Sequence, residues 1–156
     1  MEKTTFAAGC FWGVQLDFDR MDGVISTVVG YMGGDMENPT YEDICGGRTG
    51  HAEVVEVCFD PGQVTYDQLL EHFWQFHNPT TLNRQGPDSG SQYRSALFYH
   101  SEEQREAAEK SRTECDGSEL WPNPVVTEIT RAGQFWPAEE YHQKYLEKRN
   151  ITISCH

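Results

Sequence analysis

The chain has 156 residues, which is the length of one domain. Its 12 basic and 25 acidic side chains leave a formal net charge of −13, too negative for a protein that binds nucleic acid or an anionic membrane. Hydrophobic residues make up 37% and charged residues 24%, as in a globular rather than a disordered protein. No apolar run has the length of a membrane span or of a signal-peptide core, so we expect a cytoplasmic protein.

The hydrophobic pattern predicts alternating strands and helices. Strands are expected over 4–8, 24–31, 51–60, 94–99 and 125–130, and helices over 11–21, 66–77, 101–114 and 138–148. The segment 78–93 shows no regular period, which is long for a compact domain and typical of a functional loop. We therefore predict one catalytic domain of α/β or α+β class over 1–156, with a short mobile tail at about 149–156. The strand order does not follow from the pattern.

A cysteine stands where a predicted strand gives way to a predicted helix. In AAGCFWGVQ, residues 7–15, the apolar run ends at Gly9 and helical spacing begins at Phe11, so Cys10 lies at the helix N-terminus. Unpaired N–H groups and the helix dipole stabilise an anion there, so we expect the pKa of the Cys10 thiol to fall below ~8.5. A buried packing cysteine is the alternative interpretation.

The strand predicted over 51–60 places one carboxylate among apolar side chains. Because alternate residues share a face, Glu53 lies on the same side as Val55, Val57 and Phe59. Either the strand emerges into water at Glu53, or Glu53 is a desolvated acid with a raised pKa. An acid that holds its proton near neutral pH can act as a general acid.

Polar side chains beside loops and a thiol near the C-terminus complete the candidate set. Tyr41 in NPTYEDICGG, and Asp88 and Tyr93 in GPDSGSQYRS, lie where binding groups concentrate. Cys155 lies in a terminal segment that can reach a second, fixed thiol at little extra entropic cost. The other cysteines, Cys45, Cys58 and Cys115, are interpreted as packing residues. Cys45 is also a reserve candidate for the thiol that resolves oxidised Cys10.

Together these residues favour thiol-based redox chemistry. A Cys10 thiolate beside Phe11 and Trp12 suits a small apolar group next to an electrophilic centre, and Glu53 can protonate an oxygen there. Cys155 would then attack the oxidised Cys10 sulfur and form a disulfide that an external dithiol reduces. Methionine sulfoxide has a methyl group, a polarised sulfur and an oxygen, so it meets each demand.

Five motifs, in order, resemble the A-type peptide methionine sulfoxide reductases: GCFWG at 9–13, NPTY at 38–41, GHAEVV at 50–55, GPDSGSQYRSA at 86–96 and EEYHQKYL at 139–146. The resemblance covers nearly the whole chain. It implies an α+β fold with a ferredoxin-like sandwich core, in which helices pack against a mixed sheet. It also implies reduction of the S epimer of methionine sulfoxide, free or in oxidised proteins, with no metal or organic cofactor.

The resemblance also assigns roles to the candidate residues. It implies that Cys10 is the nucleophile, which becomes a sulfenic acid as methionine leaves. Phe11 and Trp12 are implied to form the pocket for the ε-methyl group. Glu53 is implied to be the acid that protonates the sulfoxide oxygen.

Other implied roles concern the oxygen and the recycling of the enzyme. Tyr41 and Tyr93 are implied to hold the sulfoxide oxygen by hydrogen bonds, and Asp88 to line the same site. Cys155 falls near the family's C-terminal recycling cysteine, and thioredoxin is the usual reductant. Many members carry a longer tail with two recycling cysteines, whereas one residue follows Cys155 here, so direct reduction of Cys10 by an external thiol is the alternative.

Three rival functions share some of these residues. A thiol peroxidase or cysteine redox sensor would use Cys10 and Cys155 but would not need the aromatic pair as a methyl pocket. A cysteine hydrolase would need a histidine base, for which His51 is the nearest candidate in the sequence. A binding module would use the aromatic residues for peptide docking and would turn nothing over.

Overall fold

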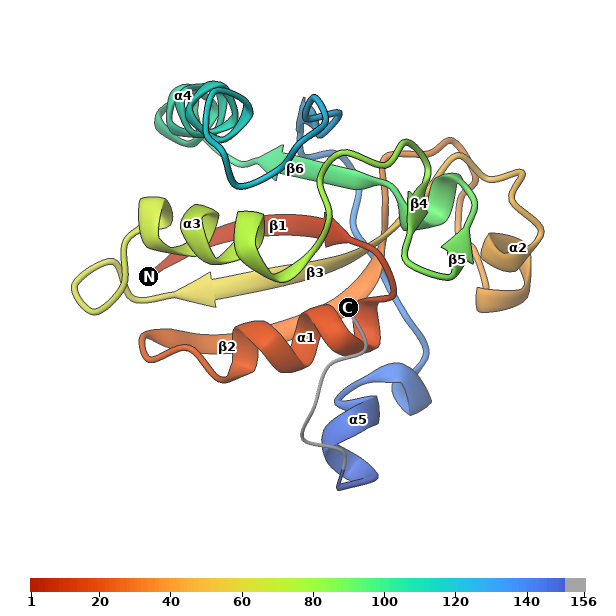
Figure 1. Ribbon diagram of the computed structural model, residues 1–156. Helices are drawn as coiled ribbons and strands as arrows, with labels where there is room; N and C mark the ends of the chain where they lie inside the picture. The colour runs from red at the N-terminus through yellow and green to blue at the C-terminus, as the bar shows by residue number, and fades with distance from the viewer. Residues whose placement is uncertain (151–156) are drawn as a thin grey trace.

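The computed structural model describes residues 1–150. Its core is made of two interlocked β–α–β units: β1 (Glu2–Ala8), α1 (Phe11–Asp19) and β2 (Val24–Met32), then β3 (Ala52–Phe59), α3 (Tyr66–Phe76) and β6 (Ser95–Tyr99). The sheet order is β7-β6-β1-β3-β2-β8, in which β8 is Trp136–Pro137. Figure 1 labels its central strands β6, β1, β3 and β2. Neighbouring strands are antiparallel except β6 and β7 (Glu128–Arg131), which are parallel. The central order β6-β1-β3-β2 is that of a ferredoxin-like fold, so the predicted α+β class with a mixed sheet is confirmed.

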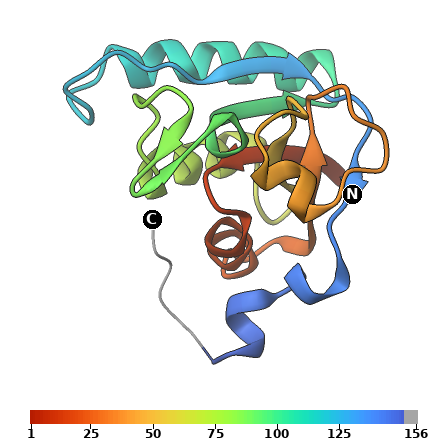
Figure 2. The same ribbon diagram turned by 90° about the vertical axis from the view of Figure 1, so that its right-hand side faces the viewer.

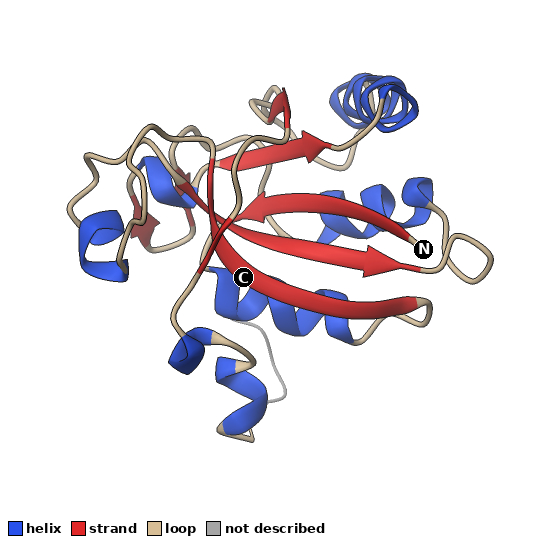
Figure 3. Ribbon diagram, turned by 180° about the vertical axis from the view of Figure 1, so that it is seen from behind, coloured by secondary structure: helices blue, strands red, loops and turns tan. Residues whose placement is uncertain are grey.

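Helices α1 and α3 cover one face of the sheet, which Figure 3 shows from the opposite side. Alternation along β3 divides its side chains between the two faces. Val55 and Val57 join the large cluster beneath these helices, whereas Ala52 and Val54 join a smaller cluster on the other face. Helix α4 (Glu102–Asp116) lies beside α3 and over β6 and β7. The predicted division of the third strand is thus confirmed, since Val55, Val57 and Phe59 share one buried face.

One edge of the sheet collects the segments that carry the candidate residues. Because β1 and β2 are both antiparallel to β3, they end where β3 begins, and β6 also begins there. The connections at this edge contain α2 (Tyr41–Cys45), a hairpin of β4 (Arg84–Gln85) and β5 (Asp88–Ser89), and the 3-10 helix η1 (Ser91–Tyr93). Figure 2 shows these elements from that side. The topology therefore brings together residues that are far apart in the sequence.

Two predicted elements differ from the structure in their extent. The segment 78–93, predicted as a loop, contains the β4–β5 hairpin and η1. The strand predicted from 125 begins at Glu128. The preceding amides bond outside the sheet, since the N–H of Val125 donates to Asp116 Oδ1 at 2.8 Å and that of Val126 to the carbonyl of Pro79 at 2.9 Å.

The prediction of one continuous helix over 138–148 is wrong. After β8 (Trp136–Pro137), the chain forms a 3-10 helix η2 (Glu140–His142) and a short helix α5 (Tyr145–Lys148). Lys144, between them, has a φ of 57°, which lies in the left-handed region and interrupts a helix. There the backbone N–H of Lys144 donates to Gln15 Oε1 of α1 at 2.7 Å.

The side chain of Gln143 ties the same segment to the sheet. Its Oε1 accepts from the N–H of Val29 at 3.0 Å, and its Nε2 donates to the carbonyls of Val29 at 3.0 Å and Ala138 at 3.1 Å. The amide thus acts as one more hydrogen-bonding unit at the edge of β2. Tertiary hydrogen bonds, rather than helical periodicity, set the conformation of residues 138–148.

Gln143→Ala should lower the free energy of unfolding by about 2 kcal/mol, because it leaves the N–H of buried Val29 without this acceptor. Urea unfolding measures the loss. Gln134→Ala is the control, since Gln134 is exposed and bonds only to the carbonyl of its neighbour Phe135 at 3.3 Å. Equal stability of the two variants would contradict the anchoring role of Gln143.

Candidate active site

Cys10 occupies the N-cap position of α1, as predicted. β1 ends at Ala8, and Gly9, with a φ of 98°, turns the chain into the helix through a conformation that glycine adopts without strain. The Cys10 carbonyl accepts from the N–H of Val14 at 3.4 Å, and the side chain is half-buried. The first turn of α1 carries no acidic residue, so its positive end remains available to an anion. Activation of the thiol by this helix end stays a prediction.

Glu53 lies in the helix-facing row of β3 and is 1% exposed, which excludes a strand end emerging into water. Its Oε1 accepts from the N–H of Phe11 at 3.2 Å, at the start of α1. Its Oε2 is buried and has no hydrogen-bond partner among the described residues. Burial and, to a smaller extent, the charge of Asp88 raise the pKa of Glu53 to about 8, against the opposing effect of the Phe11 N–H. The carboxyl is therefore mainly protonated at neutral pH.

Tyr41, Asp88 and Tyr93 lie around this carboxyl. Burial, followed by the negative charge of Glu53, raises the pKa of Tyr41 and of Tyr93 far above the usual value. Asp88 and Cys10 also raise the pKa of Tyr93, which places that hydroxyl within electrostatic reach of both. The two tyrosines are half-buried and remain neutral. The structure thus places two O–H donors within electrostatic reach of the carboxyl of Glu53.

Phe11 and Trp12 form an aromatic wall next to the cysteine. The Phe11 ring is fully buried, with its centroid 5.7 Å from that of Tyr31 and 5.2 Å from that of His142. Trp12 is half-buried and stacks on Tyr145 at 3.7 Å and an interplanar angle of 7°. The first turn of α1 therefore carries a thiol and an aromatic surface, and the protonated carboxyl of Glu53 bonds to its backbone.

A family model described as peptide methionine sulfoxide reductase matches residues 2–156. A relative described as peptide methionine sulfoxide reductase MsrA, from Methanothermobacter thermautotrophicus, is 64% identical over 147 residues, which cover 94% of this chain and 87% of the relative. This chain belongs to the peptide methionine sulfoxide reductase family. It is an oxidoreductase that reduces methionine sulfoxide.

Solved structures of the family share the fold. Mxr1 from Saccharomyces cerevisiae in reduced form superposes with a TM-score of 0.92 at 37% identity, over 99% of this chain and 88% of the yeast chain. Mxr1 in complex with Trx2 gives a TM-score of 0.65 at 27% identity, over 92% of this chain and 84% of the yeast chain. The likeness to reduced Mxr1 extends over almost all of this reductase.

Glu139 lies in the motif EEYHQKYL, but no role for it was predicted from the sequence. Glu139 Oε1 accepts from the Tyr31 hydroxyl, and Oε2 accepts from the backbone N–H of Tyr41, each at 3.0 Å. Burial raises the pKa of Glu139, but these hydrogen bonds outweigh it and lower the pKa overall. The reductase therefore holds the start of α2 through a carboxylate that lies 98 residues further along the chain. Spacing in the sequence gave no signal for this contact.

The remaining cysteines occupy different environments. Cys155 lies outside the described residues. Cys115 is buried in α4 and Cys58 is half-buried in β3, as expected for packing residues. Cys45 is exposed at the end of α2, so the prediction that it is a packing residue is wrong. Cys45 also raises the pKa of Tyr41 and hence lies near that hydroxyl.

His51 does not fit the role of a hydrolytic base. Its Nδ1 accepts from the N–H of Gly34 at 3.0 Å, and its Nε2 lies 2.7 Å from the carbonyl oxygen of Met36. Both ring nitrogens are thus engaged in holding a loop. The imidazole is 2% exposed, as expected for a structural residue.

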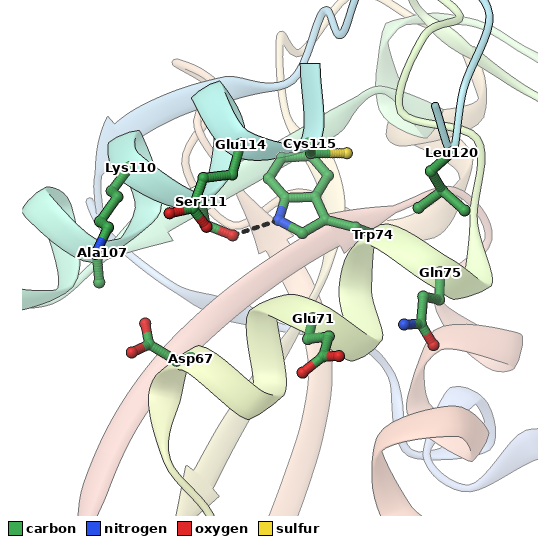
Figure 4. A pocket seen from close by; sticks show the side chains of 10 residues that line it. All are labelled: Asp67, Glu71, Trp74, Gln75, Ala107, Lys110, Ser111, Glu114, Cys115 and Leu120. Atoms are coloured by element: carbon green, nitrogen blue, oxygen red, sulfur yellow. Dashed lines mark hydrogen bonds between the residues drawn. The ribbon is translucent and has the colours of Figure 1, made fainter. Parts of the chain in front are cut away.

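A groove of about 420 Å³ lies elsewhere in the reductase, between α3 and α4 (Figure 4). The indole of Trp74 lines it and donates to Ser111 Oγ at 2.6 Å. None of its lining residues belongs to the candidate site. Over residues 1–150, no group of three or more His, Cys, Asp or Glu residues is arranged to hold a metal ion, and no helix is long and apolar enough to cross a membrane.

Glu53→Gln should change how stability depends on pH. Folding raises the pKa of Glu53 from 4.5 to about 8, so the unfolded chain loses this proton first as pH rises. The stabilisation from the protonated group is fully present below pH 4.5 and is lost as pH passes through 8. We expect the free energy of unfolding of the variant, relative to wild type, to rise by a few kcal/mol over that range in urea titrations. A difference that is constant with pH would contradict a buried neutral acid.

Proposed function

We propose that this reductase acts on the S epimer of methionine sulfoxide through a sulfenic acid on Cys10. The observation that carries the proposal is Glu53, a protonated acid that bonds to the N–H of Phe11 beside the thiol and whose second oxygen has no partner among residues 1–150. Cys10 Sγ attacks the sulfoxide sulfur while Glu53 protonates the oxygen. The oxygen, now a hydroxyl, passes from the substrate sulfur to Cys10 Sγ as the transient Sγ–S bond breaks, so the sulfoxide is reduced by two electrons to methionine and the thiol is oxidised to the sulfenic acid.

The hydroxyls of Tyr41 and Tyr93 would stabilise the oxygen as its charge develops. Their raised pKa values keep both groups as donors across neutral pH. Asp88 lies close enough to raise the pKa of both Glu53 and Tyr93. Its role in lining the site is therefore to favour the protonated form of the acid.

Discrimination between epimers would follow from three fixed contacts at the substrate sulfur. The methyl group would lie against Phe11 and Trp12, the oxygen would face Glu53, and the attacking thiol would approach from the N-terminal end of α1, where Cys10 is the N-cap. Exchanging methyl and oxygen would place the polar oxygen against an aromatic wall without a hydrogen bond, which is costly. Only one epimer satisfies all three contacts.

Recycling would use Cys155 and thioredoxin. The Cys155 thiolate attacks the Cys10 sulfenic acid, a disulfide forms and water leaves. A dithiol such as thioredoxin then reduces the disulfide and becomes oxidised itself. The complex of the yeast relative with Trx2 supports this partner, and the motif order supports Cys155 as the recycling thiol.

A single turnover without reductant tests the catalytic half of the proposal. On a peptide containing racemic methionine sulfoxide, we expect about one equivalent of the S epimer to disappear per enzyme while the R epimer persists, because the thiol is used once. Chiral chromatography quantifies both epimers. Cys10→Ser should abolish the turnover, since a hydroxyl is a far weaker nucleophile.

Hydrogen peroxide serves as the control substrate in the same experiment. A thiol peroxidase would consume peroxide and leave both epimers of the sulfoxide intact, and that result would replace the proposed function. Trp12→Ala would then have no effect on peroxide consumption, whereas it should slow reduction of the sulfoxide by removing one wall of the methyl pocket.

Thiol counting tests the recycling half. After a single turnover the wild-type enzyme should have lost two thiols per methionine formed, because Cys10 and Cys155 become a disulfide. Cys155→Ser should lose one thiol, retain its first-turnover rate and stop turning over with thioredoxin. Cys45→Ser is the matched control and should behave as wild type. A disulfide that persists in Cys155→Ser but not in the double variant with Cys45→Ser would assign recycling to Cys45.

A further inference from the structure

His142 lies among the rings of the aromatic wall. It is 1% exposed, and its ring centroid lies 5.2 Å from that of Phe11, 5.7 Å from that of Trp12 and 4.4 Å from that of Tyr41. One imidazole from the C-terminal segment thus packs against three side chains from two other parts of the chain. No other described residue has a ring contact with all three.

A hydrogen bond links this imidazole to the tryptophan. Trp12 Nε1–H donates to His142 Nδ1 at 2.9 Å. An indole N–H can only donate, so Nδ1 must be unprotonated and the proton of the neutral ring lies on Nε2. Burial lowers the pKa of His142, which favours this neutral form, although Glu139 opposes the shift.

A stacked tyrosine ring also covers one face of the Trp12 indole. Tyr145 stacks on it at 3.7 Å, and the guanidinium carbon of Arg149 lies 3.6 Å from the centroid of the Tyr145 ring. Rotating Trp12 about its side-chain bonds would break the bond to His142 and the stack on Tyr145 together. The hydrogen bond fixes the edge of the indole, and the stack fixes its plane.

We propose that His142 is a positioning residue, which sets the width of the methyl pocket by fixing the indole of Trp12. The proposal rests on the proposed function, in which Trp12 forms one wall of that pocket. His142 acts through Trp12 rather than through the sulfoxide. A pocket with a fixed wall fits an S-methyl group and rejects an S-ethyl group, so His142 would determine the selectivity for methionine sulfoxide over ethionine sulfoxide.

Three substitutions separate the hydrogen bond from packing. His142→Asn retains an acceptor, because Asn Oδ1 occupies nearly the position of Nδ1. His142→Leu removes the acceptor. The control is His72→Leu, which removes an imidazole that packs on Phe18 and Phe76 and has no ring contact with the aromatic wall.

Single-turnover rates at low substrate concentration give the first measurement. We expect the single-turnover rate of His142→Leu on methionine sulfoxide to fall about tenfold, because the hydrogen bond that holds the indole is lost. The loss for ethionine sulfoxide should be smaller, so the ratio of the two rates narrows several-fold. The rate should fall at subsaturating substrate concentration and stay near the wild-type rate at saturation, because the variant weakens substrate binding. The ratio of the rate on methionine sulfoxide to that on ethionine sulfoxide should stay close to the wild-type value in His142→Asn and should be unchanged in His72→Leu.

The indole N–H of Trp12 gives a second measurement that does not depend on activity. Its ¹H–¹⁵N resonance is assigned from its absence in Trp12→Phe. His142→Leu should speed the exchange of this proton with water, whereas His142→Asn and His72→Leu should leave it slow. If His142→Leu does not fold, His142→Gln replaces it, because its longer side chain cannot place an acceptor at the Nδ1 position.

The outcomes separate this proposal from the proposed function. An unchanged methyl-to-ethyl ratio with unchanged indole exchange would overturn the positioning role while leaving the reductase activity intact. A wild-type enzyme that reduces neither sulfoxide would overturn the proposed function, and indole exchange would still decide whether His142 fixes Trp12. A narrowed ratio together with faster exchange supports both.

Discussion

The hydrogen bond between the N–H of Phe11 and the carboxyl of Glu53 joins the sheet to the start of α1, and the arrangement of the site depends on it. A carboxyl that is 1% exposed is costly to ionise, so it holds its proton at neutral pH. The same helix end favours negative charge on a thiol. Two anions at one helix N-terminus would repel each other, whereas a neutral acid beside a thiolate does not. The bond therefore places a protonated carboxyl beside the Cys10 thiol without a conflict of charge.

Strand direction explains why these groups meet. Cys10 follows the end of β1, Glu53 lies near the start of β3, and Tyr93 precedes β6, and all three positions fall at one edge of the sheet. The pairing of Tyr31 with Glu53 brings the end of β2 to the same place. The ferredoxin-like order thus brings a thiol, a carboxyl and a hydroxyl from separate parts of the sequence to one edge of the sheet.

The parts of the site that the sequence predicted are those that local rules govern. Two-residue alternation placed Glu53 on the same apolar face as Val55 and Val57, and the change from a strand pattern to a helical one placed Cys10 at a helix start. The helix predicted over 138–148 failed because long-range bonds override its periodicity. A backbone bond to Gln15 and the side chain of Gln143 stabilise a left-handed Lys144, and neither is visible in a local pattern. His142 was missed for the same reason, since its role depends on contacts with distant residues.

This interrupted segment also bears on the proposed recycling. A regular helix over 138–148 would present one face to α1, whereas the break at Lys144 lets Tyr145 stack on Trp12 and Gln143 bond to β2. The chain is thereby anchored beside the pocket as far as Arg149. The six residue steps from Arg149 to Cys155 can span at most about 20 Å, so the proposed recycling requires Cys10 to lie within that distance of Arg149. A short tether raises the effective concentration of one thiol at the other. In the proposed recycling, the contacts that hold the indole of Trp12 therefore also set the point at which the tether to Cys155 begins.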